Sequence, residues 1–483
     1  MHRNCWWRSV CLMSVLLLPM AHLGCSTNPV TGRQQLSFMS EDQEVAMGRE
    51  TDPQIVAQFG EYQDAELAAY VNQIGQSMAR LSHRSSLNYT FRVLDSPVIN
   101  AFALPGGYVY FTRGILAHFN SEAELAGVMG HEIGHVTARH GADRYTKVQL
   151  ASISLGLGGL FLPRESIVNS AAQNLVGLAL LSYGRDDESQ SDELGVEYST
   201  KAGYDAHDMA EFFGTIERIS KKSGGGVPSF LSTHPNPGNR QRRVHEMAAA
   251  WQQKYPDAKG GSDRPTYLKR IAGIVYGEDP QQGFAQDGHF YHPSLRFQFR
   301  TPTGWKVANS PSQVQMVNSN GSAAIQFSLD KGSSARASAA EFSRTSQAAV
   351  RGQSQIRVHG MTGISQISDL RSQQGGTIRV LSYFIEKDAQ VYVFHGFTAA
   401  GSYSRQEPTF ERTMRSFDHL TNQAHLNRQP KRIRVETARQ GGDLRMVLQR
   451  MGADPADLED MAILNGMQLT DNVRTGELIK VAK

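Results

Sequence analysis

The chain has 483 residues, more than one hydrophobic core usually organises, so about two to four domains are expected. Its composition is 40% hydrophobic, 8% aromatic and 20% charged, which is typical of globular proteins and excludes wholesale disorder. Lysine and arginine number 49 against 46 acidic residues. This balance argues against a nucleic-acid partner, because such a protein must neutralise many phosphates.

The cysteines are confined to the N-terminus. Cys5, Cys11 and Cys25 all lie within the first 25 residues, and the rest of the chain contains none. This distribution excludes a disulfide framework, a cysteine-ligated metal site and a thiol nucleophile from the body of the protein.

Residues 1–24 have the character of an export signal. Two arginines precede an apolar run at 10–21, which is shorter than the roughly 20 residues that a membrane-spanning helix requires. The run leads into Leu23-Gly24-Cys25, which resembles a bacterial lipobox, so we expect Cys25 to carry a lipid after removal of the signal. Ser26 resembles outer-membrane sorting signals. We therefore expect a periplasmic protein, lipid-anchored at the outer membrane.

Residues 25–260 are predicted to form a mainly helical domain. Ser121 and Glu124 have capping-box spacing, which supplies hydrogen-bond acceptors for free N–H groups at the start of a helix. Short β-type runs at 89–94 and 108–111 predict a small sheet beside the helices.

A stretch rich in glycine, alanine and leucine occupies residues 150–181. Pro163 and Asn169 interrupt it before it is long enough to span a bilayer. A closely packed helical hairpin is the first interpretation, and a lid that touches lipid is the alternative.

A polar, glycine-rich run at 259–263 predicts a flexible boundary. Beyond it, alternating β-type segments and a helical piece near 339–350 predict an α+β accessory domain over 261–425. A third unit, 426–483, begins with many basic residues. The sequence assigns no chemistry to the accessory domain, so a binding or positioning role is expected.

The run His131-Glu132-Ile133-Gly134-His135 carries the strongest chemical signal. Residues four apart share one face of a helix, so both imidazoles can reach one ion, while Glu132 is offset toward a metal-bound water. This is the pattern of a zinc hydrolase. Apolar neighbours such as Val128 place the helix in a core, where unpaired polar groups are costly. They argue against a solvated helix that carries two unrelated histidines.

A catalytic zinc needs a third protein ligand and an open position for water. The metzincin pattern does not fit, because its third histidine would fall at Gly141 whereas the chain has His140. Glu188 and Asp192 lie four apart in an acidic run and share one face of a predicted helix. One of these carboxylates can bind zinc while the other accepts the free N–H of a ligand histidine.

Together these runs resemble the HtpX/BepA-type zinc metallopeptidases, the gluzincins of metallopeptidase family forty-eight, in their exported lipoprotein form. The segment 100–107 resembles the strand and turn before the zinc helix of that family. The segment 188–192 resembles its third-ligand helix, with Ser191 in place of the usual alanine. Thr233-His234-Pro235 with Arg240 resembles a His-Pro motif of periplasmic members.

The resemblance covers about residues 27–250. It implies a mainly α, zincin-type domain with zinc-dependent endoproteolysis in envelope quality control, and unfolded or misassembled envelope proteins as substrates. The zinc ligands it implies are His131, His135 and Glu188. Glu132 is then the general base at a zinc-bound water, and Asp192 orients a ligand histidine from behind. One Zn²⁺ per chain is expected.

Two roles stay open for His234. It can act as a catalytic residue that stabilises the oxyanion, or it can occupy the open position on zinc as a latch. Substrate contacts are expected from Asn100, Phe102, Leu104 and Arg240. The strand that contains Phe102 is expected to be an exposed edge that pairs with an extended substrate segment. An ordinary interior strand is the alternative.

The final segment resembles a LysM-like βααβ module. The runs that carry this resemblance are 433–435, 441–444, 464–466 and 476–481. The usual Gly-Asp-Thr-Leu is altered to Gly-Gly-Asp-Leu at 441–444. Peptidoglycan is the partner that the resemblance implies, and a solvated basic surface is the alternative.

The leading prediction is a multidomain zinc endopeptidase of the bacterial cell envelope. The alternative is a non-catalytic, chaperone-like or peptidoglycan-anchoring lipoprotein that retains the fold. Glu132 separates the two, because a scaffold has no use for a general base beside two metal ligands. A glycan hydrolase is disfavoured, since zinc ligands do not explain chemistry that uses two carboxylates.

Overall fold

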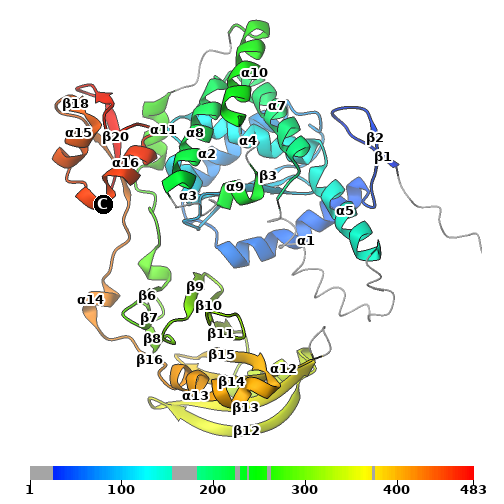
Figure 1. Cartoon of the computed structure of the whole chain (residues 1–483), viewed down its shortest axis with the longest axis vertical. Coiled ribbons are helices and arrows are strands. Elements are labelled where there is room, and N and C mark those ends of the chain that lie inside the picture. Colours follow the sequence, from blue (N-terminus) through cyan, green and yellow to red (C-terminus); the bar gives the residue numbers. More distant parts are fainter. Residues whose placement is uncertain (1–24, 155–181, 223–228, 236–238, 258–262, 372–375) are drawn as a thin grey trace, which may run out of the picture.

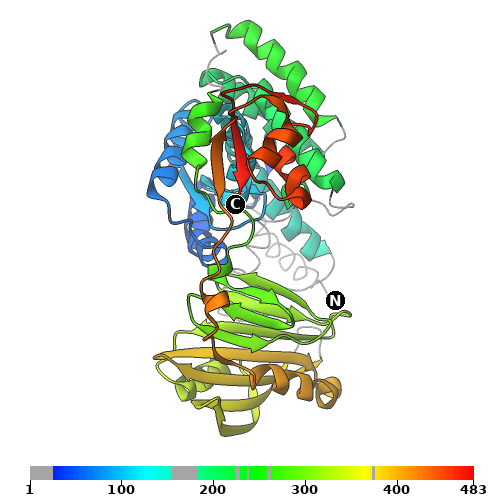
Figure 2. The ribbon, with the colours of Figure 1, turned by 90° about the vertical axis from the view of Figure 1, so that its left-hand side faces the viewer.

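The computed structural model describes residues 25–154, 182–222, 229–235, 239–257, 263–371 and 376–483. The described chain forms two bodies joined by two extended segments (Figure 1). A helical region and the C-terminal module lie side by side in one body, and a β-rich region forms the other, as a second view confirms (Figure 2). The predicted export signal and most of the hairpin predicted at 150–181 lie outside the described residues.

The helical region contains most of the α-structure. Its helices are α1 (Glu41–Phe59), α2 (Ala65–Ala79), α3 (Arg113–His118), α4 (Glu122–Thr137), α5 (His140–Ser154), α7 (Arg185–Lys201), α8 (His207–Lys222), α9 (Ser229–Thr233), α10 (Arg240–Lys254) and α11 (Arg264–Ile271). Its strands are β1 (Cys25–Thr27), β2 (Gln34–Leu36), β3 (Thr90–Leu94), β4 (Ala101–Leu104) and β5 (Tyr108–Thr112). Among the described residues, no helix combines the length and apolarity needed to cross a membrane.

The predicted small sheet is confirmed as a three-stranded sheet in the order β3-β5-β4. Strand β5 runs parallel to β3 and antiparallel to β4. Successive side chains of a strand point to opposite faces, so β4 divides its residues between two cores. Ala101 and Ala103 join the large core of the helical region, whereas Phe102 and Leu104 pack in a smaller core with Ile55 of α1. The sheet therefore lies between α1 and the remaining helices.

Helix α4 is the buried centre of this region. All of its residues except Glu122 are buried. Its N-cap is Ser121, whose hydroxyl accepts a hydrogen bond from the backbone N–H of Glu124 at 3.1 Å. The carboxylate of Glu124 accepts from the backbone N–H of Asn120 at 2.8 Å, one residue before the position that a capping box predicts. These bonds satisfy donors at a helix start that water does not reach.

Glycines let α4 and α7 cross at close range. A Cβ added at Gly195 of α7 would lie 3.0 Å from the backbone nitrogen of His131. A Cβ added at Gly130 would lie 2.9 Å from the carbonyl oxygen of Gly195. Because no side chain separates the two backbones, residues one and two turns earlier in α7 reach the histidines of α4.

The β-rich region forms two sheets. Its strands are β6 (Phe284–Gln286), β7 (His289–His292), β8 (Phe297–Arg300), β9 (Lys306–Ser310), β10 (Gln313–Val317), β11 (Ala323–Asp330), β12 (Ala349–Val358), β13 (Met361–Arg371), β14 (Thr377–Lys387), β15 (Gln390–Ala399) and β16 (Asp418–His419). Its helices are η2 (Pro280–Gln282), α12 (Ala335–Thr345), η3 (Ala400–Ser402), α13 (Tyr403–Met414) and α14 (Gln423–Leu426). An antiparallel seven-stranded sheet has the order β12-β13-β14-β15-β11-β10-β9, and a four-stranded sheet has the order β16-β8-β7-β6.

The C-terminal module has the predicted βααβ order. Its elements are β17 (Ile433–Thr437), β18 (Gly442–Asp443), α15 (Leu444–Arg450), η4 (Pro455–Asp457), α16 (Leu458–Leu464), β19 (Asn472–Val473) and β20 (Leu478–Ala482). Strand β17 pairs antiparallel with β20.

The C-terminal module shares one hydrophobic core with the helical region. Lys480 of β20 is fully buried, and its ammonium group donates to the carbonyl oxygens of Ala117 and Phe119, each at 2.8 Å. The residues around α11, up to Ile274, belong to the same core. The packing therefore places residues 264–274 in the core of the helical region.

Candidate metal centre

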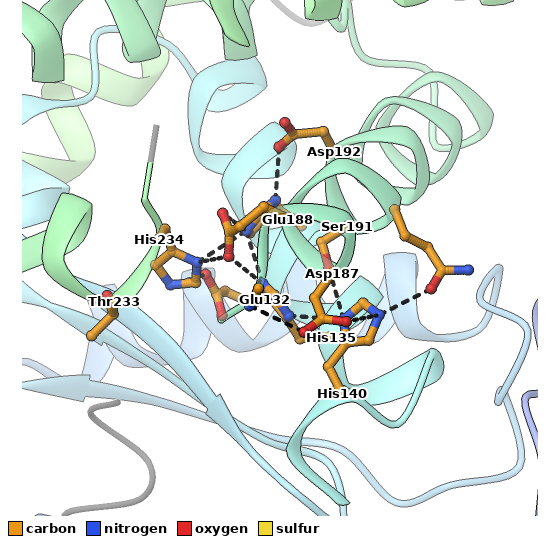
Figure 3. Close-up of polar contacts among 12 residues, drawn as sticks. Glu132, His135, His140, Asp187, Glu188, Ser191, Asp192, Thr233 and His234 are labelled. Atoms are coloured by element: carbon orange, nitrogen blue, oxygen red, sulfur yellow. Dashed lines mark hydrogen bonds and ion pairs between the residues drawn. The ribbon is translucent and has the colours of Figure 1, made fainter. Parts of the chain in front are cut away.

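Three side chains from two helices converge at the crossing of α4 and α7. The Nε2 atoms of His131 and His135 lie 3.0 Å apart. Glu188 places Oε1 3.4 Å from Nε2 of His135, and Oε2 3.7 Å from Nε2 of His131. Figure 3 shows His135 and Glu188 directed toward one point. The structure thus confirms the predicted pairing of the His131–His135 run with the acidic helix.

His234 reaches the same point from the end of α9. Its Nδ1 atom lies 3.0 Å from Oε1 of Glu188 and 3.2 Å from Nε2 of His131. One ligand atom from each of His131, His135, Glu188 and His234 lies within 4.8 Å of all the others, and all four side chains are buried. The Nε2 atom of His234 lies 3.3 Å from the carbonyl oxygen of Ala101 in β4.

The residues fit a tetrahedral zinc ion. Zinc–nitrogen and zinc–oxygen bonds of about 2.0–2.2 Å place tetrahedral ligand atoms about 3.3 Å apart, close to the separations of these four groups. The carboxylate of Asp192 only accepts hydrogen bonds, so Nδ1 of His131, 3.0 Å from it, carries the proton. The Nε2 atom of His131 therefore presents a lone pair to the other ligands, and a cation relieves the repulsion between them.

Asp192 lies behind the ligands, where the sequence placed an orienting carboxylate. Arg240 donates to this carboxylate through Nε at 3.0 Å and Nη2 at 2.6 Å, and its Nη1 lies 3.2 Å from Oε2 of Glu188. The Nη2 atom also lies 3.1 Å from Nδ1 of His131, but its shorter contact is to the carboxylate. Arg240 is 2% exposed, and its guanidinium lies 4.0 Å from the ring centroid of Phe213.

Glu132 is fully buried beside the ligands, and within the described residues neither of its oxygens makes a hydrogen bond. Burial raises the pKa of Glu132 to about 7, because the charged form loses its hydration. Burial acts in the same direction on Glu188, but the charges of His234 and Arg240 outweigh it and hold the pKa of Glu188 well below its usual value. The site therefore pairs an ionised ligand with a carboxyl that can take up a proton near neutral pH.

The four residues predicted to contact substrate lie in different environments. Strand β4 is an edge of its sheet, yet all four of its residues are buried, and the side chains of Phe102 and Leu104 pack against α1. The Asn100 side chain accepts a hydrogen bond from the hydroxyl of Thr233 at 3.2 Å, next to His234. Arg240 lies beneath the ligands, bonded to Asp192.

Two further side chains border the ligands. Tyr183 stacks on His135 with ring centroids 3.7 Å apart, and its backbone N–H donates to the carbonyl of Thr233 at 3.0 Å. His140, at the start of α5, places Nδ1 3.0 Å from Nδ1 of His135. The sequence offered His140 only as a histidine out of register with the metzincin motif, and it offered no signal for Tyr183, which lies five residues before Glu188 but belongs to no motif.

Comparison with known proteins also indicates similarity to metallopeptidases. Residues 65–248 match the model described as Peptidase family M48. A "Putative beta-barrel assembly-enhancing protease" of Vibrio cholerae is 33% identical over 205 residues, 41% of each chain. The "Mitochondrial metalloendopeptidase OMA1" of Arabidopsis thaliana is 33% identical over 165 residues, 34% of this chain and 32% of the relative.

A fungal relative is matched over a larger share of its length. The "Mitochondrial metalloendopeptidase OMA1" of Schizosaccharomyces pombe is 27% identical over 231 residues, 47% of this chain and 67% of that protein. This chain covers less than half the length of the Vibrio and Arabidopsis relatives. Sequence match and metal-site geometry coincide: the segment 65–248, which is similar to peptidase family M48, contains the HExxH-type site of His131, His135, Glu188 and His234.

Proposed function

We propose that the protein is a zinc-dependent endopeptidase of the bacterial cell envelope that hydrolyses peptide bonds in unfolded or misassembled proteins. The observation that carries the proposal is the convergence of Glu188 on His131 and His135, with Glu132 beside them. Within the described residues Glu132 makes no hydrogen bond, and its Oε1 lies 3.4 Å from Nε2 of His234. A buried carboxylate without a hydrogen bond, next to the ligand cluster, supports catalysis over a scaffold that retains the fold.

The roles of the residues follow from the geometry. His131, His135 and Glu188 would hold Zn²⁺, which polarises the scissile carbonyl and lowers the pKa of a bound water to about 7. Glu132, whose burial keeps it able to accept a proton near pH 7, takes up the proton and delivers it to the leaving amine. Strand β4, next to His234, is an edge of its sheet, but its residues are buried. Once uncovered, this edge would pair with an extended polypeptide through backbone hydrogen bonds, which would favour unfolded substrates.

The proposed location rests on the sequence. The predicted export signal and the lipobox-like run ending at Cys25 support a lipid-anchored protein of the periplasm. The bacterial relatives are named for beta-barrel assembly, which agrees with a location in the cell envelope. If Cys25 carries the lipid, a Cys25→Ser variant leaves the membrane fraction while the wild type sediments with it. Equal sedimentation of the two would remove the anchor from the proposal. Peptidoglycan stays a proposed partner of the C-terminal module.

The catalytic proposal is tested by metal content and casein hydrolysis. Glu132→Gln is expected to retain zinc and lose activity by several orders of magnitude, because the ligands stay but the base is gone. Glu188→Ala is expected to lose both. Glu193→Gln, on the same helix, is the control with wild-type values. Activity that survives in Glu132→Gln would contradict the role of Glu132.

For His234 we propose the latch. Its Nδ1 lies among the ligand atoms, where it would occupy the fourth position on zinc. In this arrangement His234 and Tyr183 enclose the centre. His234→Ala is therefore expected to raise peptidase activity, because it frees the position that water must occupy. A variant with unchanged activity excludes the latch, and a large loss would favour stabilisation of the oxyanion instead.

A further inference from the structure

We infer that His140 is a positioning residue for the zinc ligand His135, and that together with Gln190 it forms a neutral hydrogen-bond relay that fixes which nitrogen of His135 faces the metal. The inference rests on the proposed function, because it assigns how one ligand of that same centre is oriented.

The relay joins three helices. His135 at the end of α4 places Nδ1 3.0 Å from Nδ1 of His140, the first residue of α5. On the other side of the same ring, Nε2 of His140 lies 2.9 Å from Oε1 of Gln190 in α7. Figure 3 shows the His140 ring between His135 and α7. His140 is 4% exposed, so water does not compete freely for these contacts.

The direction of each hydrogen bond follows from the groups involved. The carbonyl oxygen of Gln190 only accepts, so Nε2 of His140 must donate and therefore carries the proton. A neutral imidazole has one protonated nitrogen, so Nδ1 of His140 has a free lone pair. That lone pair accepts from Nδ1–H of His135. The Nε2 atom of His135 is then the unprotonated one, which is the form a metal ligand requires.

Ser191 is the competing partner of the relay. Its hydroxyl lies 3.3 Å from Nδ1 of His140, against 3.0 Å for the ring of His135. The shorter contact assigns the lone pair of His140 to His135, so the hydroxyl of Ser191 is dispensable for the relay. This is the position where the family usually has alanine, which makes Ser191→Ala a matched control.

The two histidine ligands are thus oriented by different chemistry. His131 donates to the carboxylate of Asp192, whose charge Arg240 compensates. His135 donates to an imidazole, so its direct partner carries no negative charge, and the nearby carboxylate of Asp187 lies 3.8 Å from the other nitrogen, Nε2, of that ring. Zinc held by one ionised glutamate keeps a net positive charge, which preserves its ability to polarise a carbonyl. Partners behind metal ligands orient them and typically change metal affinity when they are removed.

The test is the zinc affinity of the full-length, metal-stripped protein, measured by competition with a chromophoric chelator. His140→Leu, which fills the space but accepts no hydrogen bond, is expected to bind zinc about 10–100-fold more weakly. His140→Asn places an amide oxygen near the position of Nδ1 and is expected to restore most of the affinity. Ser191→Ala is expected to bind as the wild type does.

The outcomes separate the possible failures. Weak binding by His140→Leu with recovery in His140→Asn supports the relay. Equal loss in both variants, or wild-type affinity in His140→Leu, overturns it, because a role limited to packing would not distinguish leucine from asparagine. If His140→Leu does not fold, Gln190→Met is tested in its place. We expect this variant to bind zinc several-fold more weakly, and an unchanged zinc affinity would overturn the relay. Absence of zinc binding in the wild type would instead defeat the proposed function.

Discussion

Arg240 illustrates how a single buried charge supports the metal centre. It is bonded to Asp192 and lies 3.2 Å from a carboxylate oxygen of Glu188, with no exposed path to water. Two acidic groups beneath a zinc site repel each other unless a cation lies between them. Arg240 supplies that cation, whereas the sequence alone suggested that it contacts substrate.

Replacing Arg240 by methionine separates these two roles. Loss of one partner from a buried ionic group typically costs about 3–5 kcal/mol, so we expect the free energy of unfolding of Arg240→Met to fall by that amount in denaturant titrations. Arg242→Met changes an exposed side chain on the same helix and should leave stability unchanged. A raised KM with wild-type stability in Arg240→Met would restore the substrate-binding role.

Local spacing made part of this centre predictable. His131, Glu132 and His135 lie on one helix, and the four-residue spacing of Glu188 and Asp192 fixes a shared face, so these roles follow from helix geometry. The places of Arg240 and His140 depend on how three helices meet. The periodicity of the sequence does not predict how these helices meet.

At the scale of elements, the N-cap of α4 connects the helix that carries the zinc ligands to α8. The hydroxyl of Ser121 accepts from the N–H of Glu124 and also lies 2.6 Å from the carboxylate of Asp208 in α8. Removing it breaks both connections at the start of the helix that carries the zinc ligands.

Ser121→Ala is expected to lower the unfolding free energy of the helical region by about 0.5–2 kcal/mol, the usual cost of losing an N-cap. Ser334→Ala removes the equivalent cap of α12 and should affect only the β-rich region. Domain-resolved unfolding, followed by calorimetry, distinguishes the two. A cap mutation that shifts the wrong transition would show that the two regions unfold together.

In the β-rich region, an ion-pair cluster gives stability that depends on pH. Hydrogen bonds from Arg379 and Arg351 lower the pKa of Asp369 from 3.8 to about 2. Because the folded-state pKa is lower than the unfolded one, this contribution is full above pH 3.8 and is lost as the pH falls toward 2. Asp369→Asn should therefore be less stable than the wild type at pH 6, with the difference shrinking through that window in acid titrations. A constant difference down to pH 2 would contradict the linkage.

Element types were more predictable than their limits. The alternating runs 295–299, 324–327 and 391–394 fall in or next to β8, β11 and β15. The helical piece expected near 339–350 is α12, which ends at Thr345 because Ala349 already pairs with Asp369 of β13. The end of α12 is therefore set by strand pairing, a long-range interaction, and not by local helix propensity.

At the scale of the whole molecule, two large hydrophobic cores organise the described residues. The large core unites the helical region with the C-terminal module, and a separate core of aromatic residues holds the β-rich region. Two joining segments run between them, one between α11 and β6 and the other between β16 and β17 (Figure 1).

This organisation predicts two thermal transitions in calorimetry. Leu448 is fully buried in the C-terminal module, and Leu448→Ala should cost about 2–5 kcal/mol in the transition of the helical region. Phe299→Ala is the matched core truncation in the β-rich region and should shift the other transition. If Leu448→Ala produces a third, separate transition, the module folds independently and the shared core has no cooperative effect.

The position of Lys480 has a consequence for biogenesis. The turn that leads into the zinc helix, at Ala117 and Phe119, finds its ammonium partner only in β20, more than three hundred residues later along the polypeptide. A nascent chain that has emerged as far as α10 therefore possesses every metal ligand but lacks the strand that completes their support. We therefore expect the zinc centre of the proposed peptidase to gain its final support only after the last strand has been synthesised.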